Sequence, residues 1–91
     1  MKIEFQEAII KLITEHYPKA LTGGVEQSTE AGAELAMALG GIVAFAFRLN
    51  GEVAGRTVLT TIIKTIVDNA AAIDEKSADM IREQIPKLYL N

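Results

Sequence analysis

The clearest pattern in the chain is an alternation of polar pairs and apolar pairs that runs from position 56 to position 70. Paired alternation is typical of an amphipathic helix, whose side chains project at intervals of about 100°. The same stretch is rich in β-branched residues, which favour strands. Strand alternation, however, would leave both faces of the stretch half apolar. The period therefore predicts a helix over residues 53–72.

The N-terminal segment carries a second helical stripe between residues 3 and 17. Pro18 ends the predicted helix, because the residue before a proline is biased away from the α region. A loop with two adjacent glycines follows over residues 18–27, and Ser28 is the expected N-cap of the next helix. The stripe consists of Phe5, Ala8, Ile9, Leu12, Ile13 and His16.

Residues 28–49 form the predicted central helix, which is apolar nearly all round. A helix of this kind must be buried on most of its sides. Each glycine inside it costs about 1 kcal/mol relative to alanine, and close packing is the expected compensation. We expect a small-residue ridge on this helix to form the interface between copies of the chain. The ridge consists of Gly32, Ala36, Gly40 and Ala44.

The pair Asn50-Gly51 is a strong hairpin signal. A two-residue turn would place Glu52 and Arg56 on the same face as three apolar side chains, which strand register does not tolerate. A three-residue loop would shift the strand pairing by one residue and remove this conflict between charged and apolar side chains. An α+β fold with a bulged β-hairpin at residues 43–59 is therefore the alternative. The favoured interpretation makes Gly51 a left-handed residue that ends the central helix and leads into an αα-hairpin.

A last helix is predicted over residues 74–90, with Asp74 as its N-cap. Pro86 is expected to kink or end it. The residues after Pro86 then form a short tail that packs Leu88 or Tyr89. Together the patterns predict an all-α, four-helix compact bundle, in one small helical domain over residues 1–91, around a central apolar Ala/Gly-rich helix.

Composition adds an expectation of self-association. The chain has 91 residues, of which 49% are hydrophobic and only 5% aromatic. A domain this small buries a modest share of its surface and has a thin margin of stability. A second copy would supply more buried area, so we expect a homo-oligomer, most simply a dimer. The net charge of −3 argues against nucleic acid as a partner, because such binding needs clustered basic residues.

The longest charge-free run, Leu35 to Phe47, is shorter than the roughly 20 residues that a membrane-spanning helix needs. A membrane span is therefore not expected, and a holin-like pair of short spans is kept as an alternative. Acidic residues occupy the place where a signal peptide would have its apolar stretch, which predicts a cytoplasmic protein.

Candidate chemistry is sparse. The chain has no cysteine and one histidine, so no metal site and no cofactor are expected. His16 is interpreted as a residue near a helix C-terminus, where its charge is favourable. Glu34 opens the apolar run and is expected to pair with Arg48 or Arg56 across a helix hairpin or a dimer seam. No catalytic residue is predicted.

The strongest candidate site is the polar face of the helix over residues 53–72. Residues 48–67 carry a balance of +2, whereas the rest of the chain carries −5. Hydroxyl groups and cations on one face suit an anionic small molecule, such as a nucleotide, or a partner surface. No glycine-rich phosphate loop is present. The candidate residues are Arg56, Thr57, Thr60, Thr61 and Lys64.

These features favour a non-enzymatic protein-interaction module that acts as a homo-oligomer. Its class would be a small acidic adaptor, inhibitor, immunity protein or phage-type antagonist, and its partners would be itself and another protein. The first alternative is an oligomeric binder of an anionic small ligand. The second is a holin-like membrane-active protein.

Overall fold

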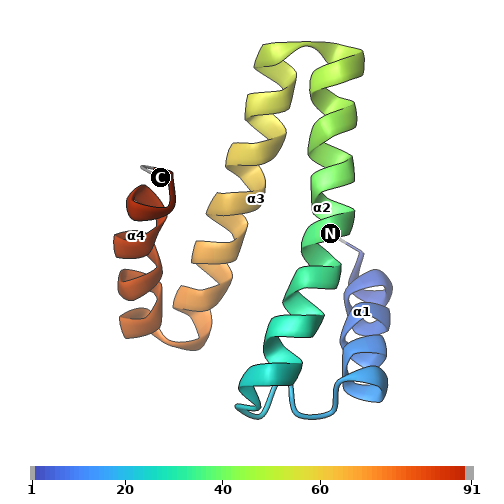
Figure 1. The fold of residues 1–91 in the computed structure, drawn as a ribbon, viewed down its shortest axis with the longest axis vertical. Coiled ribbons are helices and arrows are strands. Elements are labelled where there is room, and N and C mark those ends of the chain that lie inside the picture. The colour runs from blue at the N-terminus through green and yellow to red at the C-terminus, as the bar shows by residue number, and fades with distance from the viewer. Residues whose placement is uncertain (1, 90–91) are drawn as a thin grey trace. The chain divides into compact units, whose positions relative to one another are not determined.

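The computed structural model describes residues 2–89, with side chains as far as Pro86, and the described residues form four helices and no strand (Figure 1). The predicted all-α, four-helix fold is confirmed. The alternative β-hairpin at residues 43–59 is wrong, because both sides of the turn are helical. The helices are α1 (Ile3–His16), α2 (Val25–Asn50), α3 (Glu52–Ile73) and α4 (Glu75–Tyr89).

The chain divides into two compact units, Met1–Ile42 and Val43–Asn91. The first unit holds α1 and most of α2, and the second holds the end of α2 with α3 and α4. The single domain over residues 1–91 stays a prediction.

In the first unit, α1 lies along the side of α2 that carries Ala31, which is only 5% exposed. The loop between the helices is closed by two side chains of α2. The side-chain oxygen of Gln27 accepts a hydrogen bond of 2.7 Å from the backbone N–H of Lys19. The Ser28 hydroxyl donates a hydrogen bond of 2.7 Å to the Ala20 carbonyl. Ser28 is therefore not the N-cap that we predicted, because its hydroxyl holds the loop and α2 begins three residues earlier, at Val25.

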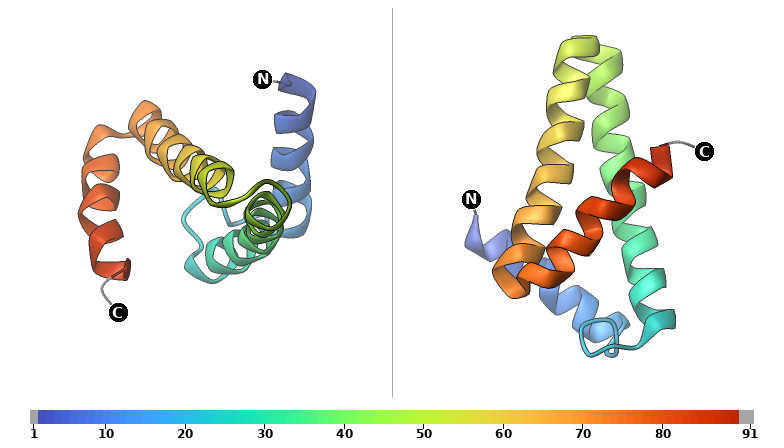
Figure 2. Two further views of the ribbon diagram at one scale, coloured as in Figure 1. Left: turned by 90° about the horizontal axis from the view of Figure 1, so that it is seen from above. Right: turned by 90° about the vertical axis from the view of Figure 1, so that its left-hand side faces the viewer.

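In the second unit, α3 and α4 pack side by side, with Val67 and Ala78 as their buried residues (Figure 2). Asp74 separates the two helices. Its carbonyl accepts the Ala78 N–H at 3.2 Å, and its carboxylate accepts the Ser77 hydroxyl at 2.5 Å. Asp74 stands at the predicted N-cap position, directly before α4, but its carboxylate binds the Ser77 hydroxyl, and no bond from a described backbone N–H to it is present.

Gly51 is the whole connection between α2 and α3. Its N–H donates to the Phe47 carbonyl at 3.0 Å, and its own carbonyl accepts the Gly55 N–H at 3.0 Å. The predicted positive φ is confirmed at +92°, but ψ is 179°, so the residue is extended rather than left-handed helical. The reason is that Gly51 is also the N-cap of α3, and an N-cap has extended ψ.

The predicted tail after Pro86 is wrong, because α4 continues through the proline to Tyr89. The proline deprives only the Arg82 carbonyl of its helical donor, and the last turn forms beyond it. The predicted packing of Leu88 or Tyr89 lies outside the described residues, since their side chains are not placed.

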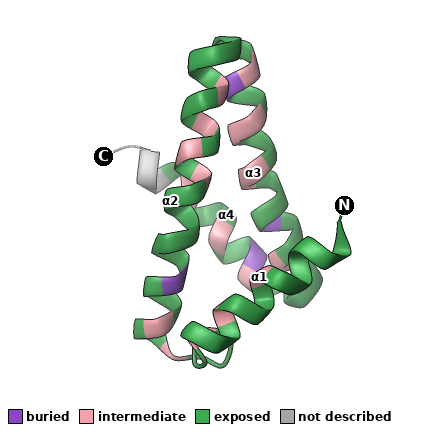
Figure 3. Ribbon diagram, turned by 90° about the vertical axis from the view of Figure 1, so that its right-hand side faces the viewer, coloured by how far each residue is buried: buried purple, intermediate pink, exposed green. Residues whose placement is uncertain are grey.

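The apolar side chains of α2 are largely exposed (Figure 3). Met37 is 77% exposed and Phe45 is 58% exposed. The expectation that this helix is buried on most sides is wrong for the single chain, because α1 covers only the side that carries Ala31.

Candidate functional site

The predicted polar face of α3 forms a shallow surface depression of about 390 Å³. Lys64 lies one turn further along the helix and does not line it. The structure therefore brings four of the five predicted residues together on one helix. The lining residues are Val53, Arg56, Thr57, Thr60 and Thr61.

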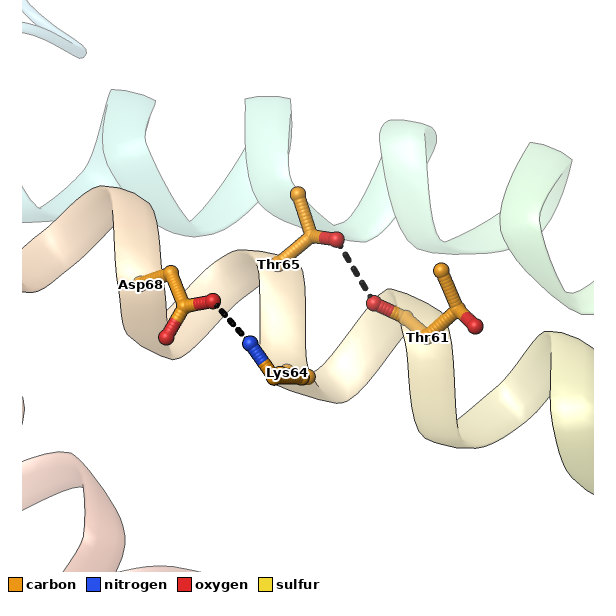
Figure 4. Close-up of polar contacts among 4 residues, drawn as sticks. All are labelled: Thr61, Lys64, Thr65 and Asp68. Atoms are coloured by element: carbon orange, nitrogen blue, oxygen red, sulfur yellow. Dashed lines mark hydrogen bonds and ion pairs between the residues drawn. The ribbon is translucent and has the colours of Figure 1, made fainter.

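Most threonine hydroxyls of this face are used by their own helix. Thr57 donates to the Val53 carbonyl at 2.9 Å, Thr61 to the Thr57 carbonyl at 2.8 Å, and Thr65 to the Thr61 carbonyl at 2.7 Å (Figure 4). Each of these hydroxyl groups has a single hydrogen to donate, which is then unavailable to an anion. Among the described residues, no hydrogen bond uses the Thr60 hydroxyl.

The two cations of the face are also paired within the helix. Arg56 Nη2 lies 2.9 Å from Glu52 Oε1, and Lys64 Nζ lies 2.6 Å from Asp68 Oδ2 (Figure 4). All four side chains are more than half exposed, and exposed pairs of this spacing contribute only about 0.3–0.5 kcal/mol. A stronger acceptor could therefore displace either carboxylate at small cost.

The first unit contains a second hollow of about 270 Å³, between α1 and α2, which the sequence did not predict. It is mostly apolar, with a polar end formed by His16, Tyr17 and Glu34. Its full lining is Ile9, Leu12, Ile13, His16, Tyr17, Ala31, Glu34, Leu35 and Ala38.

Within the described chain Glu34 is engaged by Tyr17 and not by Arg48 or Arg56, so the predicted pairing across the helix hairpin is wrong, whereas a pairing across a dimer seam stays a prediction. A hydrogen bond to the Glu34 carboxylate raises the pKa of the Tyr17 hydroxyl above its usual value, and desolvation and the charges of Glu34 and Glu30 add to the rise. Arg56 pairs with Glu52 instead, because a partner one helical turn away needs no long-range contact.

The glycines of the chain separate into two groups. A Cβ added at Gly55 would overlap the Phe47 ring, and one added at Gly24 would lie 2.6 Å from Lys19 Cβ. At Gly32, Gly40 and Gly41 an added Cβ would meet no atom within 4 Å. Contacts within the described chain thus explain Gly24 and Gly55, whereas the three glycines inside α2 lie in open space.

No family model, curated protein or solved structure matches this chain. Its own residues therefore provide what can be inferred of its function. The described part contains no group of three acidic, cysteine or histidine residues placed to hold a metal ion. Length and composition alone would allow α2 to cross a membrane, with a mean hydropathy of 1.5 over its most apolar window. Helices in soluble proteins share these properties, so they do not place α2 in a membrane.

Proposed function

We propose that the protein is a non-enzymatic interaction module that works as a homo-oligomer and uses α2 as its association surface. The observation that carries this proposal is that the most apolar window of α2 is entirely unburied in the single chain. Burying a side chain such as Met37, Ile42 or Phe45 contributes about 1.5–3 kcal/mol. Covering several of them in a second molecule is a large driving force for association.

The open glycines of α2 support the same proposal. Gly32 and Gly40 lie on the small-residue ridge defined above, and each weakens an isolated helix by about 1 kcal/mol. Close approach of another helix would compensate for this cost, because the absence of a Cβ lets two backbones come near. Within the described chain, no other element lies against these positions.

With α2 covered, the remaining surface is charged and suits a second protein. Exposed ion pairs occur on α1, α3 and α4, and the chain carries a net charge of −3. A partner with a basic surface would be favoured by charge complementarity. This combination suits a small acidic adaptor, inhibitor, immunity protein or phage-type antagonist.

The substitution Gly40→Leu tests the role of α2. The native chain should have an oligomeric mass by light scattering at micromolar concentration, and Gly40→Leu should move it toward the 9.8 kDa of one chain. Ala72→Leu, an exposed small-to-large change on α3, is the matched control and should keep the native mass. A native chain that is monomeric, or a Gly40→Leu chain with native mass and native melting temperature, would contradict the proposal.

A second candidate function is the binding of an anionic small ligand at the depression of α3. It is favoured by the placement of Arg56 and Thr60 on one open surface, with Lys64 a turn away. The ligand would replace Glu52 as the partner of Arg56 and Asp68 as the partner of Lys64. It would also accept a hydrogen bond from the free Thr60 hydroxyl. Titration with a nucleotide at low salt tests it, since Lys64→Glu should abolish binding and Lys76→Glu, on α4, should not. Equal binding by both variants would exclude this site.

A further inference from the structure

One line along α2 carries an ordered set of charged, small and apolar residues that are exposed or half-exposed, although Glu34 at one end also lines the hollow beside α1. Glu34, Gly41 and Arg48 are spaced seven residues apart, so they follow one line along the helix. Met37 and Phe45 flank this line and are among the most exposed apolar residues of the helix. We call these five residues the α2 seam.

The two ends of the seam have opposite charge and lie at equal distances from Gly41. Each end is about 10 Å from Gly41 at the rise of an α-helix. In an antiparallel pair centred on Gly41, Glu34 of each copy faces Arg48 of the partner subunit. In a parallel pair, glutamate would face glutamate and arginine would face arginine, which is unfavourable.

The same antiparallel register matches the uncharged positions. It places Met37 of one copy at the same level as Phe45 of the partner subunit, on opposite flanks of the seam, so an apolar residue of each copy lies at this level. It also places the two Gly41 residues at the crossing point, where an added Cβ would meet no atom within 4 Å in the single chain. A helix pair can approach most closely at such a point.

From these matches we infer that the seam binds the seam of a second copy of the chain in antiparallel orientation, with Glu34–Arg48 ion pairs at both ends. This inference rests on the proposed self-association through α2 but centres it on Gly41, which lies about 100° around the helix from Gly40 of the small-residue ridge. The Tyr17 hydroxyl on Glu34 is compatible with it, because a carboxylate has room for about four hydrogen bonds. The two-fold symmetry closes the assembly, as expected for an isologous interface.

Charge reversal tests the orientation by analytical ultracentrifugation. Glu34→Arg and Arg48→Glu should each raise the dissociation constant at least tenfold at low salt, because each creates two repulsive pairs. The double variant Glu34→Arg with Arg48→Glu should return to the native value. Glu75→Arg, an exposed reversal on α4, is the control and should have no effect. A parallel pair predicts no weakening by either single reversal.

Cysteine cross-linking tests the register, because the native chain has no cysteine. Under oxidation, Gly41→Cys should form a covalent dimer. Glu34→Cys alone should not, since the two sulfur atoms would lie about 20 Å apart along the helices. A mixture of Glu34→Cys and Arg48→Cys chains should link. If the Gly41→Cys side chain is too large for the crossing, the mixed pair and the charge reversals decide the register.

The outcomes separate this inference from the function proposed above. A native chain that is monomeric, or that associates only with lipid vesicles, overturns both. A dimer that is lost with Gly40→Leu but is indifferent to the charge reversals overturns the seam alone. Self-linking of Glu34→Cys as fast as Gly41→Cys also overturns the seam and indicates a parallel pair.

Discussion

At the scale of single residues, Phe47 and Gly55 pack closely within the second unit. Gly55 is buried, and the Phe47 ring occupies the space that a side chain at position 55 would need. The ring would have to move if position 55 carried even a methyl group. This contact fixes how the first turn of α3 approaches the last turn of α2.

Gly55→Ala is therefore expected to destabilise the fold by about 1–3 kcal/mol through overpacking, despite the higher helix propensity of alanine. Urea denaturation measures the change. Adding Phe47→Leu should recover part of the loss, because leucine vacates the ring position. Ala72→Leu, a small-to-large change at an exposed position of the same helix, is the control and should cost much less. Equal losses for the two variants would contradict the packing argument.

Tyr17 provides a prediction about pH. Its phenol is hydrogen-bonded to Glu34 and its pKa is raised, so the bond is intact below pH 10 and is lost as the pH rises through the elevated pKa. Absorbance titration of a Tyr89→Phe chain, which keeps Tyr17 as its single tyrosine, should show a midpoint above 10.

Glu34→Gln should move that midpoint down toward the ordinary value, because both the charge and the strongest acceptor are removed. Glu75→Gln, a matched change on α4, should leave it in place. A native midpoint at or below 10 would argue against the Tyr17–Glu34 bond.

Residue-level contacts were predictable where they are local and not where they cross a loop. The position of Asp74 directly before α4 was predicted from its neighbours, and the bond that its carboxylate accepts from Ser77 lies within one turn. The Tyr17–Glu34 bond joins residues on either side of a loop whose path the sequence did not give. The threonines of α3 were correctly placed on one face, but their bonds to the preceding turn depend on side-chain rotamers.

At the scale of elements, the α2–α3 connection depends on one residue. Gly51 has φ of +92° and ψ of 179°, a conformation that is essentially restricted to glycine. The hydrogen bonds on both sides of it belong to helices, so the connection has no spare residue to absorb a change.

Gly51→Ala is expected to destabilise the fold by about 1–3 kcal/mol, because alanine would be strained at this φ. Thermal unfolding followed by circular dichroism measures it. Asn50→Ala is the control, since Asn50 is an exposed residue within α2 and should cost much less. Equal melting temperatures for the two variants would show that the positive φ of Gly51 does not require glycine.

The sequence predicted that each helix exists more reliably than it predicted where each helix begins and ends. The polar and apolar periods predicted four helices, and the starts and ends of α1 and α3 agree with the structure within one residue. The start of α2 was missed because Gln27 and Ser28 bind the preceding loop, a contact that competes with capping. The predicted range of α4, 74–90, also agrees within one residue. The tail expected after Pro86 was wrong, because one proline removes one hydrogen bond and does not by itself stop a helix.

At the scale of the whole molecule, few side chains are removed from water. The buried apolar residues of the described part are Ala31 in the first unit and Val67 and Ala78 in the second. Two of the three are alanines, whose burial contributes little area. Units with so little buried apolar area gain more stability from binding a partner than a domain with a large core would. The stability of the fold is therefore expected to depend on the proposed association.

The melting temperature should therefore rise with protein concentration. Stabilisation by a bound partner grows by about 2.7 kcal/mol when its concentration reaches roughly a hundred times the dissociation constant. Scanning calorimetry over a hundredfold dilution series measures the rise. Gly40→Leu should melt at a lower temperature that does not depend on concentration. A native melting temperature that is constant across the series would show that the fold is stable without a partner.

The one-residue turn at Gly51 has a consequence for topology. If the torsions of Gly51 entered the α region, α2 and α3 would fuse into a continuous rod from Val25 to Ile73, roughly 70 Å long. In that rod α3 would leave its own α2 and become available to the α2 of another chain, which is the exchange that defines domain swapping. Two backbone angles of one glycine thus separate a hairpin from a swapped assembly.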